Sequence, residues 1–348
     1  MRELRIGDKI INDNSECFVI AEVGHNHQGS VETAKQIFDK AKDAGAHAVK
    51  LQKRDNKFLF TKEMYDSVYD SNNAYGKTYG AHRDALEFDV EEYIELQQYA
   101  KELGLIFFAT PFDFHSVDFL EKLDVPLYKI ASGDLVSIPL LRYVAKTGKP
   151  VIISTGGGNM DDVKKAHDAI TNENPNLAIL QCTAAYPCDP SEMNLNVIKT
   201  FRREFPNKVI GLADHQSGIG MALVAYTLGA RIVEKHFTIN RAWKGTDHSF
   251  SLEPQGLTKL IRDLRRAKVS LGDGEKKSIE KEAKPLFKMG KKLVAAIDLL
   301  KGKVLSESDI AIKSPNDGTP PYEFDNFIGL TLEKDLKKDD NLLFEDCN

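Results

Sequence analysis

Residues 17–52 read CFVIAEVGHNHQGSVETAKQIFDKAKDAGAHAVKLQ, and this stretch contains the unit from which the fold is built. It starts with an apolar run at 17–23, continues with a helix-periodic segment at 31–45, and ends with a second apolar run at 47–52. Short, nearly continuous apolar runs are typical of strands that are buried on both faces of a parallel sheet. The stretch therefore predicts two parallel β-strands joined by an α-helix.

The same pattern recurs along the chain. Helix-periodic segments follow several of the later apolar runs, as at 116–123 and 256–272. Eight strands with intervening helices in about 250 residues predict a (β/α)8 TIM barrel. An open doubly wound sheet is the alternative, but residues 22–27 read EVGHNH, not the glycine-rich fingerprint that such a sheet usually carries after its first strand. The further runs occupy 105–110, 126–131, 150–155, 177–183, 208–213 and 231–237.

Two segments interrupt this rhythm. Residues 53–90 are too long for an ordinary loop between a strand and a helix, and they follow the second strand, where barrel loops carry function. After residue 272 the pattern changes to a charged segment and then to short strand candidates. We predict a barrel domain at 1–275, a linker at 276–289 and a small β-rich domain at 290–348. A domain of that size is near the lower limit for independent folding, so we expect it to lean on the barrel or on another subunit.

Composition excludes several classes of protein. The 348 residues contain 47 Lys and Arg against 52 Asp and Glu, and this net charge of −5 argues against a general nucleic-acid binder. No apolar run is long enough for a membrane helix, and the N-terminus lacks the apolar region of a secretory signal. Four cysteines are too few for a disulfide framework. We expect a cytoplasmic enzyme with reduced thiols, without nucleic-acid or membrane partners.

Polar side chains stand at the ends of all eight predicted strands. The carboxyl ends of barrel strands surround one mouth, which is where barrel active sites are built. We therefore expect these side chains to share one cavity. In chain order they are Glu22, Lys50, Gln52, Thr110, Lys129, Ser132, Asp134, Ser154, Thr183, Tyr186, Asp214, His215, Glu234 and His236.

Lys50 and Lys129 are two cations within this set, and Thr110, Ser132 and Ser154 supply hydroxyl groups. Ammonium and hydroxyl donors together suit the phosphate or carboxylate of a small anionic substrate. The alternative is purely structural, because a buried lysine usually pairs with a carboxylate. Glu22 and Glu234 are the candidate partners in that interpretation.

His215 and His236 close neighbouring strands, and two imidazoles with a carboxylate can hold a divalent metal with open positions. Hydrogen-bonded core histidines are the alternative interpretation. His25 and His27, which follow the first strand, are weaker candidates.

Two loops carry further polar candidates. The triplet 156–158 forms either a tight turn or a set of backbone N–H groups near an anion. Asp247 and His248 either face the substrate or lie on a surface loop.

At these residues the sequence resembles the sialic acid synthase family. The matching segments cover all eight barrel units in order, and the C-terminal segment resembles the family's antifreeze-like domain, of the SAF or β-clip type. They are FVIAEVGHNHQGS, VKLQK, TPFD, YKIASGD, ISTGG, LQCTAAYP, GLADHQSGIG, VEKHFT and KGTDHSFSLEP.

The resemblance implies a phosphoenolpyruvate-dependent transferase that forms a C–C bond. Phosphoenolpyruvate would condense with the open-chain aldehyde of N-acetylmannosamine or its 6-phosphate, with Mn²⁺ or Mg²⁺ bound. Water would be consumed and phosphate released. The resemblance also implies a domain-swapped homodimer, in which each small domain covers the partner's barrel mouth.

The resemblance also assigns roles to individual residues. His215 and His236 would ligate the metal, and Glu22 would lie beside the reacting carbons. Phosphoenolpyruvate would be held by Lys50, Thr110, Lys129, Ser132 and Ser154, and the sugar by Gln52, Asp134, Tyr186 and Asp247. We predict that Glu22, Lys50, Lys129 and Glu234 are catalytic and that Thr183 joins the substrate-binding set.

Departures from the family pattern leave the sugar open. Ala184 stands where bacterial free-sugar synthases usually carry Asn, Asp134 where they carry Glu, and Ser314 where they carry Arg. Within the insertion, Lys77, His82 and Arg83 either bind a sugar phosphate or form an exposed charged loop.

Three other functions are alternatives. The first is a synthase for a related nonulosonic acid of the KDN, legionaminate or pseudaminate type. The second is an aldolase that forms a Schiff base through Lys129 or Lys50. The third is a sugar- or ice-binding protein whose activity resides in the last 60 residues.

Overall fold

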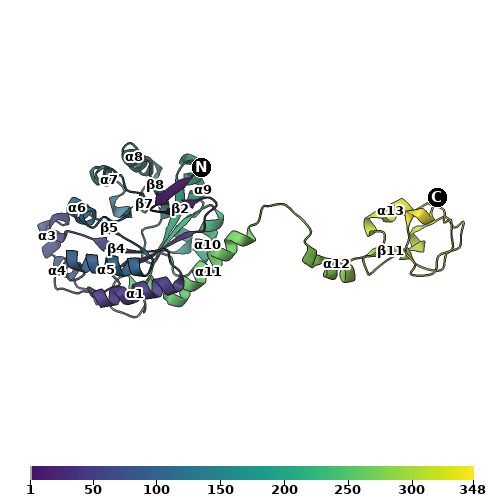
Figure 1. The fold of residues 1–348 in the computed structure, drawn as a ribbon, viewed down its shortest axis with the longest axis horizontal. Helices are drawn as coiled ribbons and strands as arrows, with labels where there is room; N and C mark the ends of the chain where they lie inside the picture. Colours follow the sequence, from purple (N-terminus) through teal and green to yellow (C-terminus); the bar gives the residue numbers. More distant parts are fainter. Residues whose placement is uncertain (1) are drawn as a thin grey trace. The chain divides into compact units, whose positions relative to one another are not determined.

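The computed structural model describes residues 2–348, which form two compact units (Figure 1). The first unit ends at Gly272, and the second is Asp273–Asn348. No helix within residues 2–348 has the length and apolar character that crossing a bilayer requires. All four cysteines are free thiols.

An eight-stranded parallel barrel forms the centre of the first unit, so the predicted fold and all eight predicted strands are confirmed. The ladder runs in the order β5-β4-β3-β10-β9-β8-β7-β6, and contacts between β5 and β6 complete the ring. The strands are β3 (Phe18–Gly24), β4 (Ala48–Lys53), β5 (Ile106–Pro111), β6 (Tyr128–Ile130), β7 (Val151–Ser154), β8 (Leu177–Cys182), β9 (Val209–Asp214) and β10 (Ile232–His236).

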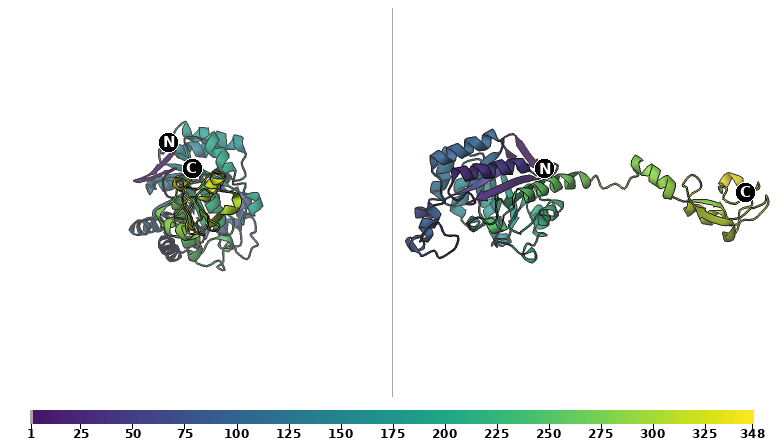
Figure 2. Two further views of the ribbon diagram at one scale, coloured as in Figure 1. Left: turned by 90° about the vertical axis from the view of Figure 1, so that its right-hand side faces the viewer. Right: turned by 90° about the horizontal axis from the view of Figure 1, so that it is seen from below.

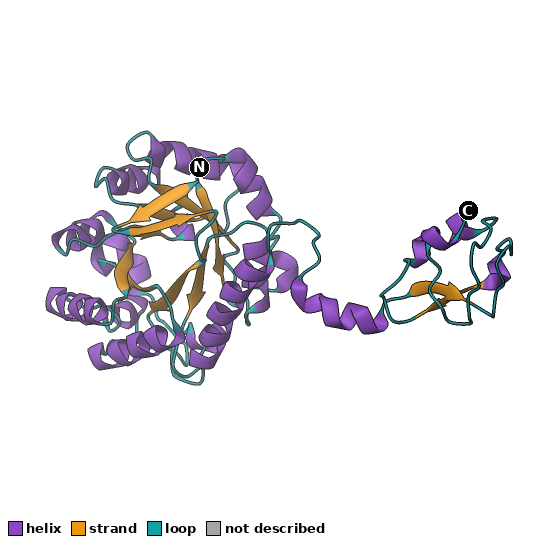
Figure 3. Ribbon diagram, turned by 45° about the vertical axis from the view of Figure 1, so that its right-hand side comes forward, coloured by secondary structure: helices purple, strands orange, loops and turns teal. Residues whose placement is uncertain are grey.

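Helices surround these strands on the outside (Figure 3). Local sequence sets their ends: the Ser30 side chain caps the first helix, and Gly45 ends it with φ +90°, a conformation that glycine adopts without strain. They are α1 (Val31–Ala44), α5 (Val90–Glu102), α6 (Phe114–Lys122), α7 (Ile138–Ala145), α8 (Met160–Thr171), α9 (Val197–Glu204), α10 (Gly220–Thr227) and α11 (Pro254–Ser270).

An N-terminal hairpin, which the sequence analysis did not predict, closes the bottom of the barrel. It consists of β1 (Glu3–Ile6) and β2 (Lys9–Asn12). Leu4, Ile6 and Ile11 are almost fully buried and belong to the cluster of apolar side chains inside the barrel. Burial of each such side chain stabilises the fold by about 1.5–3 kcal/mol, which holds the hairpin in place. The hairpin thus covers the end of the barrel opposite the strand carboxyl ends.

The insertion after β4 folds into short helices at the other end of the barrel from the hairpin (Figure 2). These are α2 (Asn56–Leu59), α3 (Lys62–Asp66) and α4 (Tyr79–Asp84), with a single bridge between Val68 and Thr78. The insertion therefore adds side chains to the mouth at which the strands end.

The second unit has its own small core. Its strands β11 (Lys292–Ala295) and β12 (Ile310–Lys313) pair antiparallel, and isolated bridges continue the β-structure to residue 347. The helices are α12 (Ala283–Met289), which lies in the predicted linker, and α13 (Phe324–Phe327). Its core contains Leu293, Leu299, Leu305, Ile310, Phe327, Leu332, Leu336 and Leu342.

Candidate active site

A cavity of about 390 Å³ lies at the mouth of the barrel, within the first unit. The side chains that form its walls alternate along each strand, because residues two apart on a strand share a face. Lys50 and Gln52 therefore both line it from β4, as Glu234 and His236 do from β10. The lining comprises Glu22, His25, Lys50, Gln52, Arg54, Arg83, Thr110, Phe112, Lys129, Ala131, Ser132, Gly133, Ser154, Cys182, Ala184, Tyr186, His215, Glu234, His236, Thr246 and Asp247.

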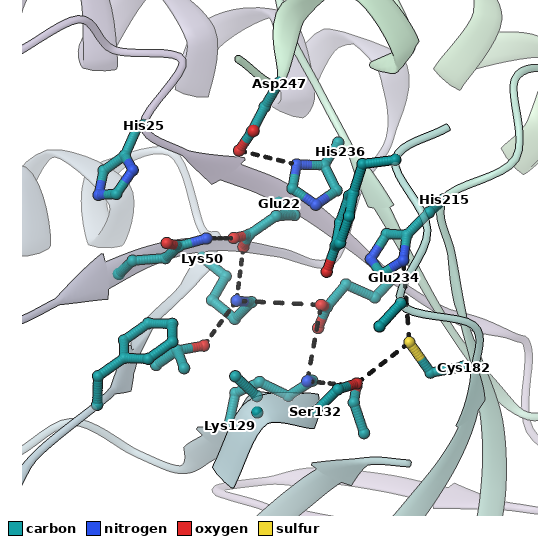
Figure 4. Close-up of a pocket in the computed structure, with 18 of the residues that line it drawn as sticks. Glu22, His25, Lys50, Lys129, Ser132, Cys182, His215, Glu234, His236 and Asp247 are labelled. Atoms are coloured by element: carbon teal, nitrogen blue, oxygen red, sulfur yellow. Dashed lines mark hydrogen bonds and ion pairs between the residues drawn. The ribbon is translucent and has the colours of Figure 1, made fainter. Parts of the chain in front are cut away.

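The floor of the cavity is a network of buried charges (Figure 4). The Lys50 ammonium lies 2.8 Å from Glu22 Oε2 and 3.9 Å from Glu234 Oε1, and the Lys129 ammonium lies 3.8 Å from the same Glu234 oxygen. Each lysine also donates to a hydroxyl group, at 2.7 Å to Thr110 and at 2.6 Å to Ser154. The lysines are thus paired with carboxylates, as the structural interpretation predicts, and they also face the cavity. Binding of an anionic substrate by them stays a prediction.

The two carboxyl groups titrate differently. Burial raises the pKa of Glu22 to about 7, and the Glu234 charge adds to this rise, while Lys50 opposes it. Burial would also raise the pKa of Glu234, but Lys129 and Lys50 outweigh burial and hold that pKa below its ordinary value. Glu22 can therefore exchange a proton near neutral pH while Glu234 stays ionised, which is a separation that acid–base catalysis uses.

Lys129 is almost fully buried, and burial lowers its pKa, as the neighbouring Lys50 charge also does; Glu234 opposes the change. Lys129 Nζ also donates to the Ile130 carbonyl at 3.0 Å. The ammonium is therefore fixed in position and only partly neutralised by the protein.

His215 and His236 lie beside each other in the cavity wall, with ring centroids 5.4 Å apart. His215 Nδ1 donates to the Thr183 carbonyl at 2.8 Å, which leaves Nε2 as the acceptor nitrogen. Burial lowers both pKa values, to about 4 for His215, where the neighbouring His236 adds to the effect. Both rings are thus neutral and can act as metal ligands.

This donor set fits a metal that the protein holds with two imidazoles. No group of three His, Cys, Asp or Glu side chains within residues 2–348 is arranged to hold an ion, so the remaining positions would fall to substrate or water. His236 Nδ1 is buried without a hydrogen-bond partner, and Asp247 Oδ2 lies 3.6 Å away. The bond from His215 to Thr183 is the kind of outer contact that orients a ligating imidazole.

Most predicted site residues meet in this cavity, but Asp134, Thr183 and Asp214 are not among those that line it. Asp214 pairs instead with Lys235 at 3.1 Å. Asp134 ends a short 3-10 turn after β6, and burial raises its pKa to about 6. The Thr183 hydroxyl donates to the Glu192 carbonyl, while the Thr183 carbonyl accepts from the ring of His215. Thr183 therefore orients the ring of His215 through its carbonyl group.

Of the three weaker histidine candidates, one lines the cavity and two have structural contacts. His25 lines the cavity, whereas His27 stacks on Phe88 and accepts from the Gly29 N–H. His248 is fully buried and bonds to Thr238.

Within the insertion, Arg83 faces the cavity. Lys77 is exposed away from it, and His82 is buried against the ring of Tyr69.

The 156–158 triplet forms a tight turn, closed by the Gly158 N–H to the Thr155 carbonyl. The Gly156 N–H already donates to Ser132 Oγ at 3.0 Å. A Cβ at residue 156 would come within 2.8 Å of that oxygen, so glycine is required for this close approach.

Several lining residues were missed in the sequence, among them Arg54, Phe112 and Cys182. Arg54 continues the alternation of Lys50 and Gln52 past the end of β4, and Phe112 continues that of Thr110 past β5. Extending the period of two beyond the apolar runs would have found both. The sequence analysis assigned no role to Cys182, which ends β8.

Comparisons with known proteins identify the family of this chain. A family model described as NeuB family matches residues 37–276, and one described as SAF domain matches residues 292–346. N-acetylneuraminate-9-phosphate synthase from Homo sapiens is 39% identical over 330 residues, which cover 94% of this chain and 92% of the relative. N,N'-diacetyllegionaminic acid synthase from Campylobacter jejuni is 34% identical over 326 residues, covering 92% and 97%.

Among solved structures, N-acetylneuraminic acid synthetase from Leptospira borgpetersenii, crystallised with citrate, superposes with a TM-score of 0.71. The two sequences are 31% identical, and the match covers 82% of this chain and 95% of the chain of that synthetase. The resemblance seen in the sequence is thereby confirmed, and a binding protein without catalytic activity is not supported. This chain belongs to the NeuB family of sialic acid synthases and related nonulosonic acid synthases, and it carries a SAF domain in its second unit.

Proposed function

We propose that this protein condenses phosphoenolpyruvate with N-acetylmannosamine or its 6-phosphate, consuming water and releasing phosphate. The product is N-acetylneuraminate or its 9-phosphate. The observation that carries the proposal is the cavity floor, where two buried ammonium groups and two hydroxyls converge beside a carboxyl group whose pKa is raised to about 7.

Phosphoenolpyruvate carries a phosphate and a carboxylate, and the floor supplies donors for both. Lys50 and Lys129 provide charge, and Thr110 and Ser154 provide hydroxyl groups at 2.7 and 2.6 Å from them. The Ser132 hydroxyl lines the same cavity. Glu234 remains between the lysines as the counter-charge that keeps the empty floor stable. Near neutral pH Glu22 is partly protonated, so Glu234 is the carboxylate that stays ionised beside both lysines. An anionic substrate adds further negative charge to balance the two ammonium groups.

Glu22 acts as the general acid and then as the general base. Its carboxyl group accepts from the Gln52 amide at 2.8 Å and lies beside Lys50, where the reacting carbons would meet. It donates a proton to the aldehyde oxygen as the C–C bond forms between the aldehyde carbon and the methylene carbon of phosphoenolpyruvate. It then takes a proton from the water that adds to the former enol carbon. The C–O bond from that carbon to phosphate breaks, phosphate leaves with the proton of the new hydroxyl group, and the keto group of the product forms. Gln52, Tyr186 and Asp247 line the same cavity and would contact the sugar.

A divalent metal, Mn²⁺ or Mg²⁺, would be held by His215 and His236. When bound, such an ion polarises an aldehyde oxygen as a Lewis acid. The Thr183 carbonyl keeps His215 in the tautomer that presents Nε2. A homodimer, inferred from the family resemblance, and a cytoplasmic location, inferred from the composition, belong to the same proposal.

The test is phosphate release from phosphoenolpyruvate with Mn²⁺ present. N-acetylmannosamine, its 6-phosphate, mannose and mannose 6-phosphate are compared as acceptors, and mass spectrometry identifies the product. We expect release that requires an N-acetylated sugar. Release with the plain hexoses alone would point to a KDN-type product, and no release with any acceptor would contradict the proposal. Lys129→Met serves as the inactive control.

A further inference from the structure

A second cationic cluster lies in the same cavity, apart from the lysine floor. Arg54 follows β4, and Arg83 comes from α4 in the insertion; their Nη1 atoms lie 3.0 Å from His25 Nε2 and 3.2 Å from His25 Nδ1. All three side chains line the cavity. Figure 4 shows His25 across the cavity from His215 and His236.

The hydrogen-bond donors of this cluster outnumber its acceptors. A guanidinium has only donors, and a neutral imidazole has one donor and one acceptor nitrogen. The pKa of His25 is well below its ordinary value because of burial and the charges of Arg54 and Arg83, so the ring is neutral. One of the two arginines therefore directs an N–H at another N–H, and the cluster lacks an acceptor.

Negative charge compensates this cluster only from a distance, through Glu87 and Asp247. Arg54 is 8% exposed, and its guanidinium lies over the ring of Phe112 at 3.7 Å. The nearest carboxylate to Arg54 is Glu87 at 4.0 Å, and Glu87 already pairs with Lys53 at 3.2 Å. Within residues 2–348, the hydrogen-bond partners of Arg83 are the Tyr79 hydroxyl and the ring of His25, neither of which is a carboxylate.

We infer that Arg54, His25 and Arg83 form a binding site for a phosphate monoester on the sugar substrate, and that this site selects the 6-phosphate over the free sugar. The inference rests on the proposed function. Two separate cationic sets in one cavity require two anions, and phosphoenolpyruvate occupies the lysine floor. Planar guanidinium groups match phosphate oxygens in pairs, and an oxyanion supplies the acceptors that the cluster lacks.

Arg83→Gln tests the inference, because it removes one guanidinium from the cavity. We expect kcat/KM for N-acetylmannosamine 6-phosphate to fall about 10- to 100-fold relative to kcat/KM for N-acetylmannosamine, the loss typical of a charge-assisted hydrogen bond. The KM for phosphoenolpyruvate should change less than threefold. Arg83→Lys, which keeps the charge, should recover part of the selectivity.

Lys77→Gln is the matched control, since it removes the same charge from an exposed position of the same insertion. It should leave the ratio unchanged. Calorimetric titration of wild-type protein and Arg83→Gln with N-acetylmannosamine 6-phosphate adds a measurement that does not need turnover. Thermal melts check that each variant is folded.

Each result is decisive. Equal losses with both sugars in Arg83→Gln, or a wild-type preference for the free sugar, would overturn the inference while the proposed function stands. Binding of the 6-phosphate that depends on Arg83, without phosphate release from phosphoenolpyruvate, would uphold the site and contradict the proposed function.

Discussion

Glu234→Gln gives the sharpest test of the charge network. The substitution keeps the shape of the side chain but removes the carboxylate that lies 3.8 Å from the Lys129 ammonium. Lys129 itself is 2% exposed. Breaking a buried ion pair costs about 3–5 kcal/mol when the other charge stays behind. Lys129 keeps its bonds to Ser154 and to the Ile130 carbonyl, so we expect the lower figure, about 3 kcal/mol. For a domain of this size that corresponds to a fall in Tm of about 6–12 °C.

The loss should depend on pH in a defined direction. The pKa of Lys129 is already lowered by burial, and removal of Glu234 lowers it further. The unfolded chain then binds more protons than the folded protein between that lowered pKa and the ordinary value of 10.5. Stability of the variant should therefore recover as pH rises through this window. Urea unfolding at several pH values, followed by circular dichroism, measures the change.

Asp214→Asn is the matched control, because Asp214 pairs with Lys235 at 3.1 Å in an equally buried position that does not line the cavity. It should also destabilise the barrel. Saturating phosphoenolpyruvate should raise the Tm of Glu234→Gln by more than that of wild type, since the ligand supplies the missing anion, and should not do so for Asp214→Asn. A loss below about 1 kcal/mol in Glu234→Gln, or a loss independent of pH, would refute the reasoning.

Four further predictions follow from the site. Glu22→Gln should lower kcat by about 10²–10⁴ and abolish the decline in rate above pH 7 that the raised pKa of Glu22 predicts in wild type; a decline that persists in the variant's pH–rate profile would assign it to another group. A chelator should abolish activity and Mn²⁺ restore it, and His215→Ala should weaken Mn²⁺ binding measured by calorimetry; chelator-resistant turnover would exclude the proposed metal. Borohydride with pyruvate should leave no adduct on Lys129 by mass spectrometry, whereas an adduct would favour the aldolase. A chain ending at residue 289 should unfold cooperatively, because the barrel core ends before Gly272, yet be inactive; full activity would argue against the proposed domain-swapped dimer.

Short apolar runs that alternate with helix-periodic segments predicted most of the barrel. The eight apolar runs match the eight strands, because a strand buried on both faces needs apolar side chains at nearly every position. The polar exceptions among them, such as Lys50 and His236, line the cavity because a closed parallel barrel brings all strand carboxyl ends to one mouth. The hairpin at residues 3–12 was missed because its short strands mix charged and apolar residues, and its stability comes from packing inside the barrel.

The sequence by itself determined the barrel, its family and the polar side chains that meet at its mouth. Each strand and helix is visible as a local pattern of apolar residues, and a barrel built from such strands brings all their carboxyl ends to one mouth. Only the tertiary structure decided which loop residues join those polar side chains. Thr183 orients His215, Asp134 lies outside the cavity lining, and Arg54 and Arg83 converge on His25 from two separate segments. These outcomes depend on contacts between residues far apart in the chain, and no local period encodes the distance between such groups.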